Sequence, residues 1–134
     1  MGGRKLLKLL SVLIFVIFFI NFSANTFYWY SSIGYFDTIV HYFGGAWVGF
    51  FTLYLSSEEL PSARLVIKVL ISVLLVGVCW EAYELIIDKV VSGNFLNPLD
   101  TVSDLFFDFA GGASALLYYI YKIMSLRTSK VQSQ

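Results

Sequence analysis

The chain has 134 residues, of which 58% are hydrophobic and 13% are charged, and its formal net charge is zero. Soluble domains average about 45–50% apolar and about 25% charged residues, so this composition excludes an ordinary soluble domain. The apolar residues gather in four runs, each near the roughly 20 residues that cross a bilayer. We therefore expect an all-α, four-transmembrane-helix bundle, a multi-pass protein of the cell (inner or plasma) membrane with membrane lipid and no nucleic acid as its partner.

A single integral-membrane domain is predicted over residues 1–123. Its helices are expected at about 6–22, 37–55, 65–88 and 100–121. The basic start of the first run also fits a signal peptide, but the length of the apolar part favours an uncleaved anchor. The connector at 25–36 is rich in aromatic residues and is expected as a loop or short helix at the membrane interface. The polar segment at 124–134 has no apolar face and is predicted to be a largely disordered cytoplasmic tail.

The basic residues predict the orientation, because Lys and Arg in short loops stay on the cytoplasmic side. Eight of the nine lie before the first run, around the loop between the second and third runs, or after the fourth run. Only Lys89 lies in the loops expected on the opposite side. Both termini are therefore predicted to be cytoplasmic.

Ionisable side chains recur at helical spacing in the second, third and fourth runs. They are Asp37 and His41, then Glu81, Glu84 and Asp88, then Asp100, Asp104 and Asp108. In the predicted orientation each set begins at the outer end of its helix. At 1.5 Å per residue, His41, Glu84 and Asp104 then lie about 6 Å deep. Three helices thus place ionisable groups at one depth, and we expect one shared polar site in the outer half of the membrane.

These carboxylates cannot all be ionised without a counter-charge, since two like charges 4–6 Å apart repel by about 3–4 kcal/mol at an effective dielectric of 20. No Lys or Arg lies in the outer halves of these helices. The site must therefore hold shared protons or a cation. Carboxylates and one imidazole suit Mg²⁺, Mn²⁺, Ca²⁺, Zn²⁺ or Fe. The predicted metal ligands are Asp37, His41, Glu84, Asp104 and Asp108.

The predicted catalytic residues are Asp104, Asp108 and Glu81, which could act as acid or base beside a metal-activated water. Asp100 and Asp88 accompany the site, and Asp37 and Asp100 could also serve as helix caps. Whether the protein is an enzyme stays open. It could be a metal-dependent enzyme acting on an envelope lipid or lipid-linked substrate, or a non-enzymatic membrane scaffold. It could also bind a cation or proton for transport or sensing, and transport by so few helices would need a homo-oligomer.

Two further patterns concern helix packing. Gly45 and Gly49 form a small-xxx-small pair in the second run, and Gly111 and Gly112 follow the last acid of the fourth, so both pairs predict close helix approach. The first run carries no residue expected to join the site and is interpreted as scaffold.

The motifs together resemble those of the YjdF-like and VanZ-like small polytopic membrane proteins, over about residues 37–120. They are Asp37-x3-His41-x2-Gly44, Trp80-Glu81-x2-Glu84 and Asp100-Thr101-x2-Asp104-x3-Asp108-x2-Gly111. The YjdF-like pattern is the closer, although this chain has fewer segments and Trp80-Glu81 is its own variant. The resemblance implies a polytopic inner-membrane protein and no established reaction.

Overall fold

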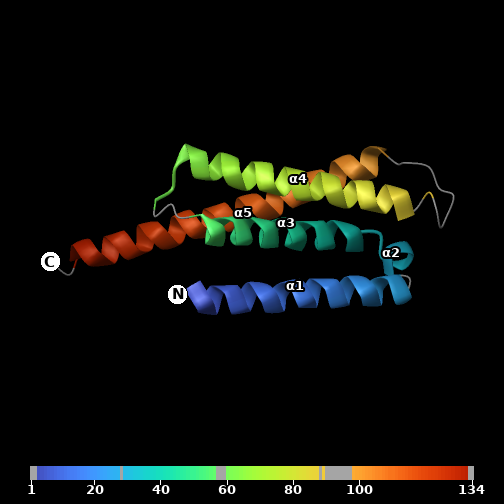
Figure 1. Cartoon of the computed structure of the whole chain (residues 1–134), viewed down its shortest axis with the longest axis horizontal. Helices are drawn as coiled ribbons and strands as arrows, with labels where there is room; N and C mark the ends of the chain where they lie inside the picture. Colours follow the sequence, from blue (N-terminus) through green and yellow to red (C-terminus); the bar gives the residue numbers. More distant parts are fainter. Residues whose placement is uncertain (1–2, 28, 57–59, 88, 90–97, 133–134) are drawn as a thin grey trace.

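The computed structural model describes residues 3–27, 29–56, 60–87, 89 and 98–132. The helices in these residues are α1 (Gly3–Thr26), α2 (Trp29–Ser32), α3 (Phe36–Leu55), α4 (Ala63–Ile87) and α5 (Pro98–Gln132). The four long helices run alternately in opposite directions, and both termini lie towards the same end, on the left of Figure 1. The all-α class predicted from the sequence is confirmed.

The predicted helix bounds differ from the observed ones mainly at the C-terminus. α3 begins one residue before the expected position, at Phe36, and the short helix α2 lies within the aromatic connector. α5 continues to Gln132, so the prediction of a largely disordered tail was wrong. Extending an existing helix needs no new nucleation, and Leu, Met, Lys, Arg and Gln in the tail are good helix formers.

Among the residues that the structure describes, two helices are long and apolar enough to cross a membrane, over Arg4–Ala24 of α1 and Ala63–Ile86 of α4. α3 and α5 differ from these two helices in the glycines, ring hydroxyls and ionisable side chains that they carry. They are also the two helices that contain His41 and the row of aspartates.

The outer surface of α1 is strongly apolar. Phe15, Phe19 and Phe22 are 72%, 69% and 62% exposed, respectively. Contiguous exposed apolar surface of this kind marks a face that meets a membrane or another protein. The surface of α1 therefore agrees with its length and composition as a membrane-crossing helix.

α3 and α5 are packed backbone to backbone through glycines. A Cβ atom placed on Gly45 would overlap the backbone carbonyl of Asp108, and one on Gly111 would overlap the backbone carbonyl of Tyr42. A Cβ on Gly49 would lie 2.9 Å from the Cβ of Ala115. The close approach predicted from the glycine pairs is confirmed, and it fixes the height of α5 against α3.

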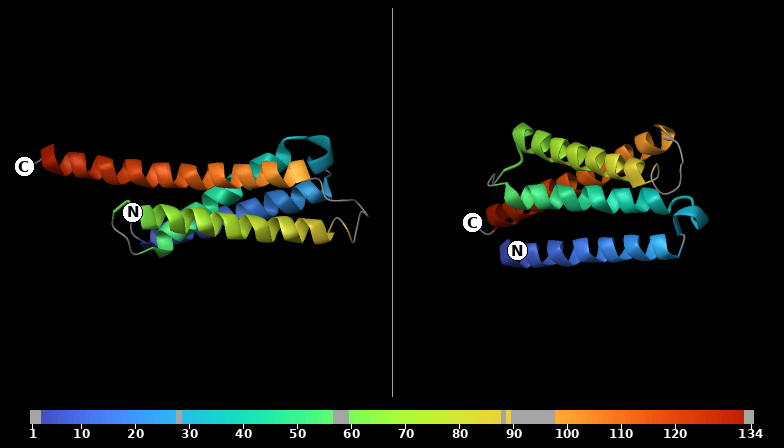
Figure 2. Two further views of the ribbon diagram at one scale, coloured as in Figure 1. Left: turned by 90° about the horizontal axis from the view of Figure 1, so that it is seen from above. Right: turned by 45° about the vertical axis from the view of Figure 1, so that its right-hand side comes forward.

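α4 covers the α3–α5 pair, and Figure 2 shows these three helices side by side in two further views. A small core at their contact consists of Val48, Val69, Val73 and Leu116. The ends of α4 and α3 that carry ionisable residues meet the start of α5 at the end of the bundle opposite the termini. The packing thus brings residues from three helices to one place.

Candidate functional site

His41 lies at the centre of the site and is buried, with 2% of its side chain exposed. Its Nε2 atom lies 3.7 Å from Asp37 Oδ1, 3.7 Å from Glu81 Oε1 and 3.9 Å from Glu84 Oε2. Its Nδ1 atom lies 3.3 Å from Asp108 Oδ2. One imidazole therefore faces carboxylates from α3, α4 and α5.

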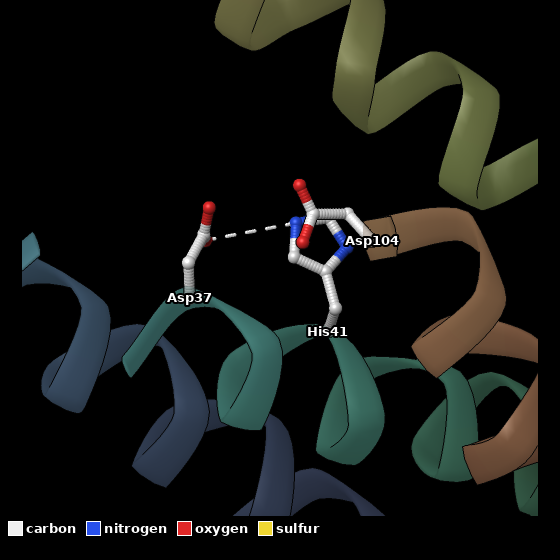
Figure 3. Close-up of side chains that lie close together, drawn as sticks. All are labelled: Asp37, His41 and Asp104. Carbon is white, nitrogen blue, oxygen red and sulfur yellow. Dashed lines mark ion pairs between the residues drawn. The ribbon is translucent and has the colours of Figure 1, made fainter. Parts of the chain in front are cut away.

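Asp104 completes the cluster from the first part of α5. It is buried, with 3% of the residue exposed, and it approaches the imidazole from the side opposite Asp37 (Figure 3). Asp37, His41 and Asp104 each offer a ligand atom within 4.8 Å of the other two. His41, Glu81 and Glu84 form a second set with the same property. The two sets share the imidazole.

The spacing of these atoms fits a cation better than direct hydrogen bonds. Distances of 3.7–3.9 Å from Nε2 to the oxygens exceed a hydrogen bond. Ligand atoms of a tetrahedral site with bonds of about 2.1 Å stand about 3.4 Å apart. The atoms of either set lie within 4.8 Å of one another, so the side chains of a set would have to close in to hold a metal. Within the described residues, Asp37 Oδ1, His41 Nε2 and Glu81 Oε1 have no hydrogen-bond partner. An imidazole nitrogen with carboxylate oxygens is a donor set that fits a metal, with Asp37 and Glu81 belonging to different sets around the shared imidazole.

Asp108 has a different position from the other carboxylates. It faces Nδ1, the ring nitrogen on the far side from Asp37 and Glu81. In the tautomer with a proton on Nδ1, this nitrogen would donate to Asp108 Oδ2 and the lone pair of the neutral imidazole would lie on Nε2. Metal-binding histidines are usually oriented in this way by a carboxylate. The position of Asp108 suits an orienting role, and its role as a metal ligand stays a prediction.

Two neighbours hold these carboxylates in place. Gly77 of α4 leaves room for Asp108, because a Cβ there would lie 2.5 Å from Asp108 Oδ2. The indole N–H of Trp80 donates a hydrogen bond of 2.8 Å to Glu84 Oε1, which leaves Oε2 facing His41. Sequence reasoning assigned neither Gly77 nor Trp80 a role, although the i,i+4 spacing of Trp80 and Glu84 allows this contact.

The remaining predicted residues lie elsewhere. Asp100 is exposed in the first turn of α5 and belongs to neither set of ligand atoms. Asp88 lies outside the described residues. Asp37 was also expected as a helix cap, but the N-cap residue of α3 is Tyr35, and no side chain caps that end. The Asp37 carboxylate turns instead towards His41, four residues along the same helix face.

The first helix contributes more than the scaffold expected of it. A pocket of about 220 Å³ lies beside the cluster and is lined by residues of α1 as well as α3 and α4, with His41 and Asp108 in its wall. The α1 residues in this wall are Ile14, Ile17, Phe18 and Asn21. Their spacing of three and four residues places them on one helix face. The sequence shows this spacing but not which other helix the face lies against.

Fold and site together define an all-helical membrane-type protein with a buried His/carboxylate cluster at one end of its bundle. The family described as "Predicted membrane protein (DUF2238)" matches residues 3–124, and the chain belongs to this family. Comparison with curated proteins and comparison with solved structures each give no match. The family agrees with the predicted membrane location at the level of a membrane protein.

Proposed function

We propose that this chain is a metal-dependent membrane enzyme that acts on the head group of a lipid or lipid-linked molecule. The observation that carries the proposal is the surrounding of His41 Nε2 by carboxylate oxygens of Asp37, Glu81 and Glu84 at 3.7–3.9 Å. Buried polar atoms without partners are costly, so they are usually retained for a ligand. A divalent cation would supply the missing partner of His41 Nε2 together with the carboxylates of one set.

The residues divide the chemistry among themselves. When bound, a divalent metal makes a water nucleophilic near neutral pH and neutralises an anionic head group. Asp108 holds the imidazole with Nε2 facing the carboxylates. Asp104 and Glu81 are both over nine-tenths buried. Each offers a ligand atom to one set, and the one that a bound metal leaves free would serve as acid or base. Glu84 and Asp37, with about a third of each side chain exposed, form the approach to the site.

The proposal includes four membrane-crossing helices, with both termini cytoplasmic and the site in the outer half of the membrane. Both termini lie towards one end of the bundle, and the beginning of α3, which carries His41, lies towards the other. Eight of nine basic residues belong to the end with the termini, as the positive-inside rule requires. A periplasmic-type phosphatase fused after Gln132 is expected to be inactive in a bacterial host, and an active fusion would contradict this orientation. The finer likeness to YjdF-like proteins belongs to the same proposal.

The metal content of the purified protein tests the site. We expect Zn²⁺ or Mn²⁺ added to the detergent-solubilised chain to bind at a stoichiometry near one. His41→Ala should weaken binding by roughly 100-fold or more, because it removes the ligand that the two sets share. Asp104→Asn and Glu81→Gln should tell the sets apart, since each variant removes a ligand from only one of them.

Asp100→Asn is the matched control, because Asp100 is an exposed aspartate on the same helix as Asp104. It should bind metal as the unmodified chain does. Absence of stoichiometric binding, or equal binding by His41→Ala, would overturn the proposed function.

A second function is favoured by one observation. All four carboxylate contacts of His41 also lie within ion-pair distance of the ring, at 3.3–3.9 Å. A protonated imidazole could therefore be held in the cluster without a metal, as in proton-carrying sites inside membranes. If no metal binds but reconstituted vesicles carry a proton or cation current that His41→Ala abolishes, this transport or sensing function replaces the first.

A further inference from the structure

The pocket beside the cluster lies in the interval between α1 and α4. Its α1 wall runs from Ile14 to Asn21 and its α4 wall from Val73 to Trp80, each at a spacing of three and four residues. α3 forms the floor from Val40 to Val48. Eight residues of helix span about 12 Å, so the pocket extends about this far along the bundle axis.

α1 is buried at two positions, one towards each of its ends, and the pocket lies between them. Leu10 and Ala24 are 3% and 0% exposed, and no residue of α1 between them is buried. The indole N–H of Trp47 donates a 2.8 Å hydrogen bond to the Leu10 carbonyl and fixes one end. These contacts lie 14 residues apart, about 21 Å along a helix. The gap is therefore built into the way α1 is attached.

The wall of the pocket is apolar along most of its length and polar at one end. His41 and Asp108 belong both to the pocket and to the cluster. Beyond them the wall consists mainly of Val, Ile, Phe and Trp side chains and three glycines, Gly44, Gly45 and Gly77, with Asn21 near the same outer end. A molecule that fills this space needs a long hydrocarbon part and a polar group at the His41 end.

We propose that this pocket binds one hydrocarbon chain of a membrane lipid, whose head group lies at the His41 cluster. A chain without polar atoms matches a wall that offers it almost no hydrogen-bonding groups. A transmembrane helix of another protein is about 10–12 Å wide and longer than the pocket. Such a helix could not enter the pocket while α1 stays in place. This inference rests on the proposed function, since it supplies the substrate class for the same site.

Gly44 offers a direct way to fill the pocket. A Cβ on Gly44 meets no atom within 4 Å, so Gly44→Leu places its side chain in the pocket without displacing the helices. Gly34→Leu is the matched control, because a Cβ on Gly34 also meets no atom within 4 Å and Gly34 does not line the pocket. The test compares these two variants with the unmodified chain.

The probe is phosphatidylglycerol with a diazirine in one acyl chain, present as a trace component of phosphatidylcholine vesicles that hold the reconstituted protein. After photolysis we expect labelled peptides from the pocket faces of α1 and α4. Gly44→Leu should lower labelling of these faces at least fivefold, whereas Gly34→Leu should leave it unchanged. Metal binding by both variants should equal that of the unmodified chain, which shows that they are folded.

A second pair of variants keeps the test valid if Gly44→Leu fails to fold. Val76 and Leu75 are neighbours on α4 and are 50% and 61% exposed, but only Val76 lines the pocket. Val76→Trp should lower the labelling and Leu75→Trp should not. Labelling that neither pocket variant lowers, or cross-links between two copies of the chain at the pocket, would overturn the inference even if metal binds. If the protein binds no metal but Gly44→Leu still lowers the labelling, the enzyme function is overturned. The inference that the pocket binds a lipid chain is then retained.

Discussion

The two faces of α3 pack in opposite ways. Towards α5 the backbones touch, and Gly45 leaves no space for even one methyl group. Towards α1 the neighbouring Gly44 meets nothing within 4 Å, and a pocket occupies the space. Adjacent glycines in one sequence thus serve two purposes. Gly45 fixes α3 against α5, and these helices hold carboxylates of the cluster around the His41 imidazole. Gly44 leaves room for the pocket beside that cluster.

The largest effect is expected at the closely packed face. Gly45→Ala introduces a methyl group where the Asp108 backbone lies, so α3 and α5 must move apart. Overpacking usually costs about 1–3 kcal/mol, and overlap with backbone atoms should place this variant at or above 3 kcal/mol in the free energy of unfolding. Unfolding in mixed micelles measures it, and metal affinity should fall with it because Asp108 shifts.

Gly44→Ala is the control for this comparison, since it makes the same change one residue earlier. Its stability should be unchanged or up to about 1 kcal/mol higher, because Ala is the better helix former. Equal destabilisation by the two variants would mean that the two faces of α3 do not differ as described.

Much of this arrangement was predictable from residue spacing. The i,i+4 pair Asp37 and His41 shares a helix face, and the pair is found 3.7 Å apart. The alternation of the helices predicted that Glu81 and Glu84 meet His41, and they do. Spacing alone could not assign each carboxylate to one ring nitrogen, because that depends on the rotation of α5 about its axis and on side-chain rotamers. Asp108 faces Nδ1 because Gly77 leaves space for its carboxylate.

The role of α1 could not be predicted from the sequence, for a different physical reason. Its apolar residues have a face towards α3, but lipid and protein interiors are equally apolar, so hydropathy does not tell a packed face from a lipid-facing one. Only the contacts at Leu10 and Ala24 show which side turns inward. The extent of α5 was missed because a polar tail has no hydrophobic signal, although helix propagation needs none.

The next largest effect concerns Asp108. If this residue orients His41, Asp108→Asn should weaken metal binding by about 10–100-fold, as replacement of such partners does elsewhere. The asparagine keeps the shape but loses the charge that increases the basicity of the imidazole. Metal affinity measured by isothermal titration, with Asp100→Asn as the control, separates the roles. Complete loss of binding would make Asp108 a ligand, and unchanged affinity would exclude it from the site.

The smallest effect is expected on the open face, at Trp47. Trp47→Phe removes the hydrogen bond to the Leu10 carbonyl but keeps an aromatic ring against Phe51, which lies stacked at a centroid distance of 5.0 Å. One neutral hydrogen bond contributes about 1 kcal/mol, so the free energy of unfolding should fall by about that amount. Amide exchange should become faster in α1 and stay unchanged in α3. Trp29→Phe, in the connector, is the control and should affect neither helix in this way.

Metal affinity should be unaltered, because none of the cluster residues belongs to α1. A loss of metal affinity in Trp47→Phe would show that the attachment of α1 also holds the site, and that the two faces of α3 act as one unit.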